Sequence, residues 1–357
     1  MILCLLVWCQ LSPDEVAWVR TMSLPPLPAN PSNRVADDEQ AAALGDLFFN
    51  AKDVAPGKMI ACASCHPAET AFTDGLETSQ GITRLTRNAP SLFLVAHQRW
   101  YFWDGRADSL WAQAIQPIED PREMGLDRSQ LGPWLAADSQ RKRIYETVFG
   151  PLTYGDREAD TQVLVNLAKS VEAFERTIQA PKRPWDQFVA DVSAHGQSDV
   201  LNSDQLAGLR LFRGKALCAT CHSGPLFSDL EFHDTRLPQP TPSPEPGRFE
   251  GVKRVKTDPF NQAGEYSDDR NTTMARWVNG LSPNVLQVGS FKTPTLRYVA
   301  LTAPYMHDGS MANLRSVVNF YNELEHARPS HHPEPLLQPI HLSEPELAQL
   351  IAFLESL

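Results

Sequence analysis

Two copies of the pattern Cys-x-x-Cys-His carry the most specific chemistry in this sequence. The first copy comprises Cys62, Cys65 and His66, and the second comprises Cys218, Cys221 and His222. Two thiols at this spacing can add across the two vinyl groups of one porphyrin, and the adjacent histidine then lies beneath the iron as its proximal ligand. The sequence therefore predicts two covalently attached c-type haems.

Two other uses of paired cysteines fit the pattern less well. A zinc site requires four well-placed ligands, and a redox-active dithiol does not require the adjacent histidine. The remaining cysteines, Cys4 and Cys9, lie within the first ten residues, so no further pair is left in the globular part of the chain. Cofactors, rather than disulfides, are expected to stabilise the fold.

The ligand on the open side of each iron decides between electron transfer and peroxide chemistry. Ten histidines are present, and none lies between His66 and His97. The first haem therefore has no distal histidine close to it in the sequence. An iron with an open coordination position is able to bind peroxide.

Helical periodicity surrounds both motifs. Apolar spacing predicts a helix over residues 38–49 that runs toward the first motif. A similar helix, with Ser203 as its expected N-cap and Gly214 as its stop, precedes the second motif, so the two halves resemble repeats of one module. A long amphipathic helix is expected over residues 164–178, and a capping box at Ser343 predicts a final packed helix.

The expected fold is mainly α, with two cytochrome c-like domains that each carry one haem. Strand-like alternation is scarce, and the turn-rich composition of residues 236–271 predicts a long loop. We expect a signal remnant and proline-rich lead-in over residues 1–30, an N-terminal haem domain over 31–195 and a C-terminal haem domain over 196–357.

Charge and the N-terminal residues bear on partners and location. The 357-residue chain has 32 basic and 43 acidic residues, a formal net charge of −11, which disfavours nucleic acid and suits a small basic electron donor. Residues 1–9 form an apolar run that is too short to span a bilayer and resembles a truncated secretory signal. Because haem is attached covalently outside the bacterial cytoplasm, we expect a periplasmic protein, with membrane association only if Cys9 is lipidated.

Several further segments resemble the bacterial di-haem cytochrome c peroxidase family, including its MauG-type branch. The matching segments are residues 87–90, 99–106, 291–297 and 302–309, which include Phe-Trp-Asp-Gly-Arg and His-Asp-Gly. They occur in order and cover roughly residues 36–357. The resemblance implies an oxidoreductase that reduces hydrogen peroxide at the haem of His66. Its electrons would arrive from the haem of His222, which a small cytochrome c or cupredoxin supplies.

The resemblance also implies roles for residues around the first haem. Glu123 matches the distal acid that would move a proton between the two oxygens of peroxide, and Gln113 and Pro117 would shape its pocket. Trp103 matches the tryptophan that relays electrons between the two haems. From the residues alone, Trp103 could equally be a core aromatic, as buried tryptophans usually are.

The second haem would take its distal ligand fourteen residues after the histidine of His-Asp-Gly, where this chain has Tyr321. The MauG-type branch has tyrosine there, and peroxidases with a cytochrome donor typically have methionine. A phenolate is a hard anionic donor that stabilises oxidised iron. Met306 and Met311 are rival ligands by chemistry, although methionines more often fill cores.

Three further residues match the calcium site that the family has between its domains. Asn88, Thr302 and Pro304 would supply side-chain and carbonyl oxygens to Ca²⁺. Asn88 could instead cap a turn before Pro90. Lys292 matches a lysine that would meet a haem propionate.

One departure from MauG itself concerns the route to a protein substrate. MauG has a surface tryptophan two residues before the first cysteine of its second motif, where this chain has Ala216. An exit through Trp277, Trp185 or another aromatic must be considered instead. Three functions therefore remain open: a peroxide-reducing enzyme, an enzyme that uses peroxide to oxidise tryptophan or tyrosine of a partner protein, and a non-enzymatic di-haem electron carrier.

Overall fold

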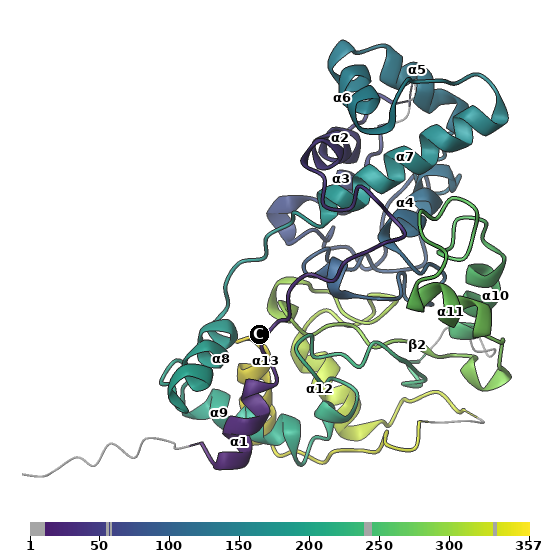
Figure 1. Cartoon of the computed structure of the whole chain (residues 1–357). Coiled ribbons are helices and arrows are strands. Elements are labelled where there is room, and N and C mark those ends of the chain that lie inside the picture. Colours follow the sequence, from purple (N-terminus) through teal and green to yellow (C-terminus); the bar gives the residue numbers. More distant parts are fainter. Residues whose placement is uncertain (1–10, 55–56, 58, 239–244, 331–333) are drawn as a thin grey trace, which may run out of the picture.

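The computed structural model describes residues 11–54, 57, 59–238, 245–330 and 334–357. The expected signal remnant and Cys9 lie outside these residues. Among the residues described, no helix is long and apolar enough to span a bilayer. Figure 1 shows two groups of helices at opposite ends of the molecule, with helices α10 and α11 along one side.

The first group of helices encloses one apolar core. Its central pair is α2 (Glu39–Phe49) and α7 (Arg157–Glu175), which cross at a glycine. A Cβ on Gly45 would lie 1.9 Å from the backbone oxygen of Ser170 on α7, so only glycine allows this close approach. Around this pair lie α3 (Cys62–Cys65), α4 (Leu110–Glu119), α5 (Leu131–Ala136) and α6 (Ser139–Phe149).

The second group repeats the same crossing. Helices α9 (Ser203–Arg213) and α13 (Glu344–Leu354) meet at Gly208, where a Cβ would lie 2.0 Å from the backbone oxygen of Gln349. The core also contains apolar side chains of α1 (Pro13–Arg20), α8 (Pro184–His195) and α12 (Leu314–Glu323). Each half is therefore built on one glycine-mediated helix pair.

The remaining elements are short. The 3₁₀ helices are η1 (Ala68–Thr70), η2 (Val95–His97), η3 (Arg128–Gln130), η4 (Cys218–Thr220), η5 (Val285–Gln287) and η6 (Val299–Leu301), and the other α-helices are α10 (Arg248–Thr257) and α11 (Thr273–Gly280). Two antiparallel strands, β1 (Phe232–His233) and β2 (Phe291–Lys292), pair Phe232 with Lys292 and His233 with Phe291. The expectation of a mainly α fold with little strand is confirmed.

A second repeat follows each haem motif. The isolated bridge between Tyr101 and Ala107 has its counterpart between Tyr305 and Met311. Positive φ angles recur at equivalent positions, 62° and 74° at Phe102 and Met306, and 67° and 68° at Gly105 and Gly309. A helix then begins in each half, α4 behind its N-cap Ser109 and α12 behind its N-cap Asn313. The two segments correspond at a constant offset, which makes Trp103 equivalent to His307 and Pro117 equivalent to Tyr321.

The structure corrects two expectations from the sequence. The N-cap of α9 is Asn202, whose side chain accepts from Gln205 N, and Ser203 is the first helical residue. Residues 236–271 are not one loop, because α10 forms within them and packs Val252 and Val255 inward. Helix α1, in the expected lead-in, and helix α8, before the expected boundary at 195, both contribute apolar side chains to the second core. The expected domain limits stay a prediction.

Candidate haem sites and distal pocket

The first Cys-x-x-Cys-His motif forms the short helix α3 and the residue that follows it. The backbone N–H of His66 donates to Cys62 O over 3.0 Å, which closes the turn. The His66 Nδ1 lies 2.9 Å from Phe72 O, so Nδ1 carries the proton and Nε2 is left as the ligand atom. Burial lowers the pKa of His66, and the neutral imidazole that results is the form that binds metal.

The second motif has the same geometry in a 3₁₀ turn. His222 N donates to Cys218 O over 2.8 Å, and His222 Nδ1 lies 2.9 Å from Phe227 O. Burial lowers the pKa of His222 as well. Both histidines are therefore fixed in the tautomer that presents Nε2 to an iron.

The cysteines fit haem attachment better than metal or dithiol chemistry. Burial raises the pKa of Cys62 to about 12, of Cys65 to about 11 and of Cys218 to about 12, whereas reactive dithiols have lowered values. Among the residues described, one group has metal-ligand spacing, Cys221 with Asp229 and His233, and it falls short of the four ligands of a structural zinc site. Paired free thiols beside an oriented histidine match the attachment chemistry of haem c.

Helix α4 brings two expected pocket residues to one face. Gln113 and Pro117 are four residues apart and both are half-buried. The chain then turns back, because Met124 N donates to Pro117 O over 3.1 Å and Glu123 N donates to Asp120 O over 3.0 Å. Glu123 is thereby held against the end of the helix that carries Pro117.

Glu123 is a half-buried carboxyl close to the first motif. Its negative charge raises the pKa of both Cys62 and Cys65, which places it within electrostatic range of the two thiols. Burial raises the pKa of Glu123 itself; Asp120 adds to this, and Arg106, Arg122 and Arg254 oppose it. A half-buried carboxyl whose pKa is raised is the type of group that serves as a positioned proton-transfer residue.

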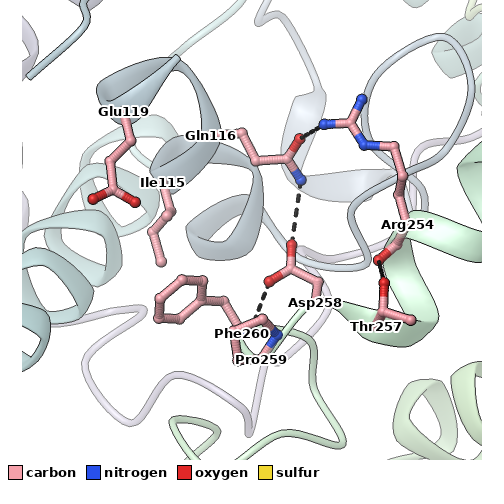
Figure 2. A pocket seen from close by; sticks show the side chains of 8 residues that line it. All are labelled: Ile115, Gln116, Glu119, Arg254, Thr257, Asp258, Pro259 and Phe260. Atoms are coloured by element: carbon pink, nitrogen blue, oxygen red, sulfur yellow. Dashed lines mark hydrogen bonds between the residues drawn. The ribbon is translucent and has the colours of Figure 1, made fainter. Parts of the chain in front are cut away.

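A cavity of about 270 Å³ lies beside this group of charges, between α4 and the segment that follows α10 (Figure 2). Gln116 is one of the residues that line it. Its Oε1 accepts from Arg106 Nε over 2.9 Å and from an Arg254 amino group over 3.2 Å, and its Nε2 donates to Asp258 over 3.4 Å. Gln116 therefore bonds two of the three guanidinium groups that act on Glu123.

Trp103 lies where the two halves meet. Its indole Nε1 donates to Asn88 O over 2.9 Å, and its carbonyl accepts from Lys292 N over 2.8 Å. Its ring meets that of His307 edge to face, with 6.4 Å between centroids. Trp103 thus contacts the second half directly, as a relay between the two haems requires.

Tyr321 is placed beside the second motif. Burial raises its pKa, the thiols of Cys218 and Cys221 add to the shift, and a hydrogen bond with Thr235 opposes it. A phenolate there needs a neighbouring cation, which a ferric iron would provide. The backbone of Met311 is paired with Tyr305 in the bridge, and the contacts described for Met306 and Met311 do not link either side chain to the second motif.

The expected calcium residues are distributed over two adjoining segments. Asn88 is buried, and its Nδ2 donates to Leu76 O over 2.9 Å. Its Oδ1 takes no part in this hydrogen bond. Asn88 N donates to His307 O over 3.0 Å, so Asn88 adjoins the segment that carries Thr302 and Pro304. Oxygen donors from two segments are a suitable set for Ca²⁺.

The ammonium of Lys292 is hydrogen-bonded to other residues of the chain. Its ammonium donates to Gln98 Oε1 and, over 2.9 Å, to Trp100 O. Burial lowers its pKa to about 7. The role expected for Lys292 at a propionate stays a prediction.

The sequence analysis missed Gln116, Arg254, Asp258 and Glu175. Gln116 shares a helix turn with Gln113 and could have been inferred from that spacing, whereas Arg254 and Asp258 lie in a stretch that was expected to be a loop. Glu175 is buried at the end of α7, and burial raises its pKa to about 8. No local sequence signal indicates its burial.

Comparison with known proteins agrees with this geometry. The sequence profile of a family described as di-haem cytochrome c peroxidase matches residues 39–194. Cytochrome-c peroxidase IdrP1 of Pseudomonas sp. (strain SCT) is 30% identical over 338 residues, which cover 94% of this chain and 84% of that protein. Methylamine utilization protein MauG of Methylorubrum extorquens is 30% identical over 343 residues, covering 95% and 82%.

A solved structure shows the same fold. The crystal structure of a MauG-like protein associated with microbial copper homeostasis superposes with a TM-score of 0.71 at 26% identity. The alignment covers 93% of this chain and 94% of that one.

Proposed function

Because the chain belongs to the di-haem cytochrome c peroxidase and MauG family, we propose that it reduces hydrogen peroxide at the first motif with electrons that arrive through the second. The observation that carries this proposal is an asymmetry between equivalent positions. Pro117, which has no ligand atom in its side chain, stands where the second half has Tyr321, and Glu123 is held beside Pro117. The first site is thus open and has a proton-transfer group, and the second is closed.

The cofactors proposed are two haem c groups, bound covalently through Cys62 with Cys65 and through Cys218 with Cys221. When bound, they would supply the electron-transfer chemistry, and His66 and His222 would hold them. The hydrogen bonds to Phe72 O and Phe227 O keep both imidazoles oriented.

Glu123 is the proposed proton-transfer residue. Its carboxylate takes a proton from the near oxygen of peroxide and returns it to the far oxygen, which leaves as water. Arg106 and Arg254, held by Gln116, oppose the effect of burial on the pKa of Glu123 and so favour its carboxylate form. Gln113 and Pro117 bound the pocket.

Trp103 is the proposed relay between the two halves, and Tyr321 is the proposed distal ligand of the second. A Ca²⁺ bound by Asn88, Thr302 and Pro304 would fix the two segments that meet at Trp103. The electron donor proposed is a small cytochrome c or cupredoxin, and the location proposed is the periplasm.

A second function is favoured by one residue. Tyr321 is the ligand type of the MauG-type branch, in which peroxide is used to oxidise tryptophan or tyrosine of a partner protein. The two functions differ in where the electrons come from. Steady-state assays separate them, because a reduced cytochrome c or cupredoxin would sustain peroxide consumption only under the first.

The proposal is tested on the haem-loaded protein with peroxide and a reduced cytochrome c. Peroxide-dependent oxidation of the cytochrome that falls sharply in Glu123→Gln is the expected result. Haem attachment without any reaction with peroxide would instead indicate an electron carrier.

A further inference from the structure

A chain of aromatic rings connects the proximal side of the second motif to the surface. His222 Nδ1 bonds to the backbone oxygen of Phe227 over 2.9 Å. The Phe227 ring lies 5.3 Å from that of Trp185, and the Trp185 ring lies 6.1 Å from that of Trp18, centroid to centroid. Trp18 also lies 6.4 Å from Phe227 directly.

The two tryptophans differ in their environments. Trp185 is 0% exposed, and its Nε1 has no hydrogen-bond partner among the residues described. An oxidised Trp185 therefore has nowhere to release its proton, and the positive charge is costly in an apolar core. Complete burial also rules out Trp185 as the surface exit itself.

Trp18 is suited to be the surface end of the chain. It lies on α1, is half-buried, and has the Arg213 guanidinium 4.8 Å from its ring centroid. A nearby cation disfavours a positive charge on the indole, so oxidation of Trp18 would be accompanied by loss of its Nε1 proton to water. A positive charge on Trp185 is therefore expected to move to Trp18, which lies nearer the surface.

The described residues of the first half show no such chain of tryptophans. The equivalent of Phe227 is Phe72, whose ring lies 5.7 Å from Phe93, which in turn lies 5.1 Å from Tyr298. Phe93 and Tyr298 are buried, and no tryptophan takes part. Ala216 offers no aromatic exit either, because it is buried in the same core as α1.

We propose that Trp185 and Trp18 form a hole-transfer route from the second haem site, and that Trp18 exchanges single electrons with a partner protein. This inference rests on the proposed function. Each peroxide takes up two electrons and two protons and leaves as two waters. In each one-electron step, Trp18 loses an electron to the interior and a proton to water, and the partner returns one electron while water returns the proton.

The test uses the full-length, haem-loaded protein treated with hydrogen peroxide in the absence of any reductant. Peptide mass spectrometry should find oxygen added to Trp18, and a rapidly frozen sample should show a tryptophan radical by electron paramagnetic resonance. In Trp185→Phe, both signals should be lost while both haems stay attached. The matched control is Trp277→Phe, which replaces an indole that is 45% exposed on α11 and should leave both signals unchanged.

Trp18→Phe keeps the test independent of core packing, because Trp18 is only half-buried. This variant should lengthen the lifetime of the spectral change that peroxide produces. Oxidation at Trp277 instead of Trp18, or Trp18 oxidation that persists in Trp185→Phe, would overturn the inference and leave the proposed function intact. A haem spectrum that does not respond to peroxide would overturn both.

Discussion

The two halves of this protein share a scaffold and differ at the positions where chemistry is decided. Each has a glycine-mediated helix pair, a histidine oriented by a phenylalanine carbonyl, and a bridged turn that leads into a helix. On those helices, Pro117 in the first half is equivalent to Tyr321 in the second. Under the proposed function, one scaffold would thus support an open site and a closed site through the exchange of one side chain.

A second pair of equivalent positions differs in polarity, because the first half has a buried glutamate where the second half has a leucine. Glu175 ends α7 and Leu354 ends α13, at the same distance along each helix from the glycine crossing. Leu354 is buried among apolar side chains, whereas Glu175 carries a buried Oε2 that has no hydrogen-bond partner among the residues described. The first half therefore retains a buried acid that the scaffold itself does not require.

The largest expected effect comes from Glu123, the proton-transfer group proposed for the first site. Glu123→Gln should keep both haems and lower the rate of reaction with peroxide by about 10²–10⁴-fold, the usual contribution of a positioned proton-transfer group. Stopped-flow mixing with peroxide measures this rate. Glu250→Gln, at an exposed position on α10, is the control and should react as the wild type does. Near wild-type rates in Glu123→Gln would place the proton-transfer group elsewhere.

Replacing Glu175 by leucine, the residue type at the equivalent position of the second half, should stabilise the fold. Because burial raises its pKa to about 8 from an ordinary 4.5, folded Glu175 keeps a proton that the unfolded chain releases, so stability falls as pH rises between these values. Glu175→Leu should remove this pH-dependent loss and raise the free energy of unfolding at pH 8 by on the order of 3 kcal/mol.

Denaturant unfolding of the haem-loaded variants at pH 5 and pH 8 measures this difference. The reciprocal change, Leu354→Glu, should introduce the same pH dependence into the second core. Equal gains from Glu175→Leu at both pH values would show that titration of Glu175 is not the cause.

Tyr321→Met should convert the closed site to the ligand type of cytochrome-dependent peroxidases. A thioether in place of a phenolate should raise the reduction potential of the second haem by on the order of 0.1 V, a fraction of the roughly 0.8 V that axial ligands span. Spectroelectrochemical titration measures both potentials in one protein. An unchanged pair of potentials would make Tyr321 a core residue.

The smallest expected effect concerns the groups that tune Glu123. Gln116→Leu should remove one hydrogen bond each from Arg106 and Arg254, which lower the pKa of Glu123, so that pKa should rise. The acid limb of the pH profile for reaction with peroxide should shift upward accordingly. A profile that does not move would show that the two arginines are positioned without Gln116.

Local patterns predicted much of this molecule. The two motifs, the helices around residues 39–49 and 344–354 and the repeat of the halves were all readable, because they depend on residues close in sequence. The position of α1 and α8 in the second core was not, since an amphipathic helix does not specify which core it joins. Gln116 and Asp258 meet across segments 142 residues apart, and such a pairing has no local signature.

Electron paramagnetic resonance of the oxidised, haem-loaded protein distinguishes an open first site from a closed one. We expect one high-spin, five-coordinate haem and one six-coordinate haem in the wild type, and a second high-spin signal in Tyr321→Phe. Two low-spin signals without a high-spin component, or a Tyr321→Phe spectrum identical to that of the wild type, would contradict this expectation.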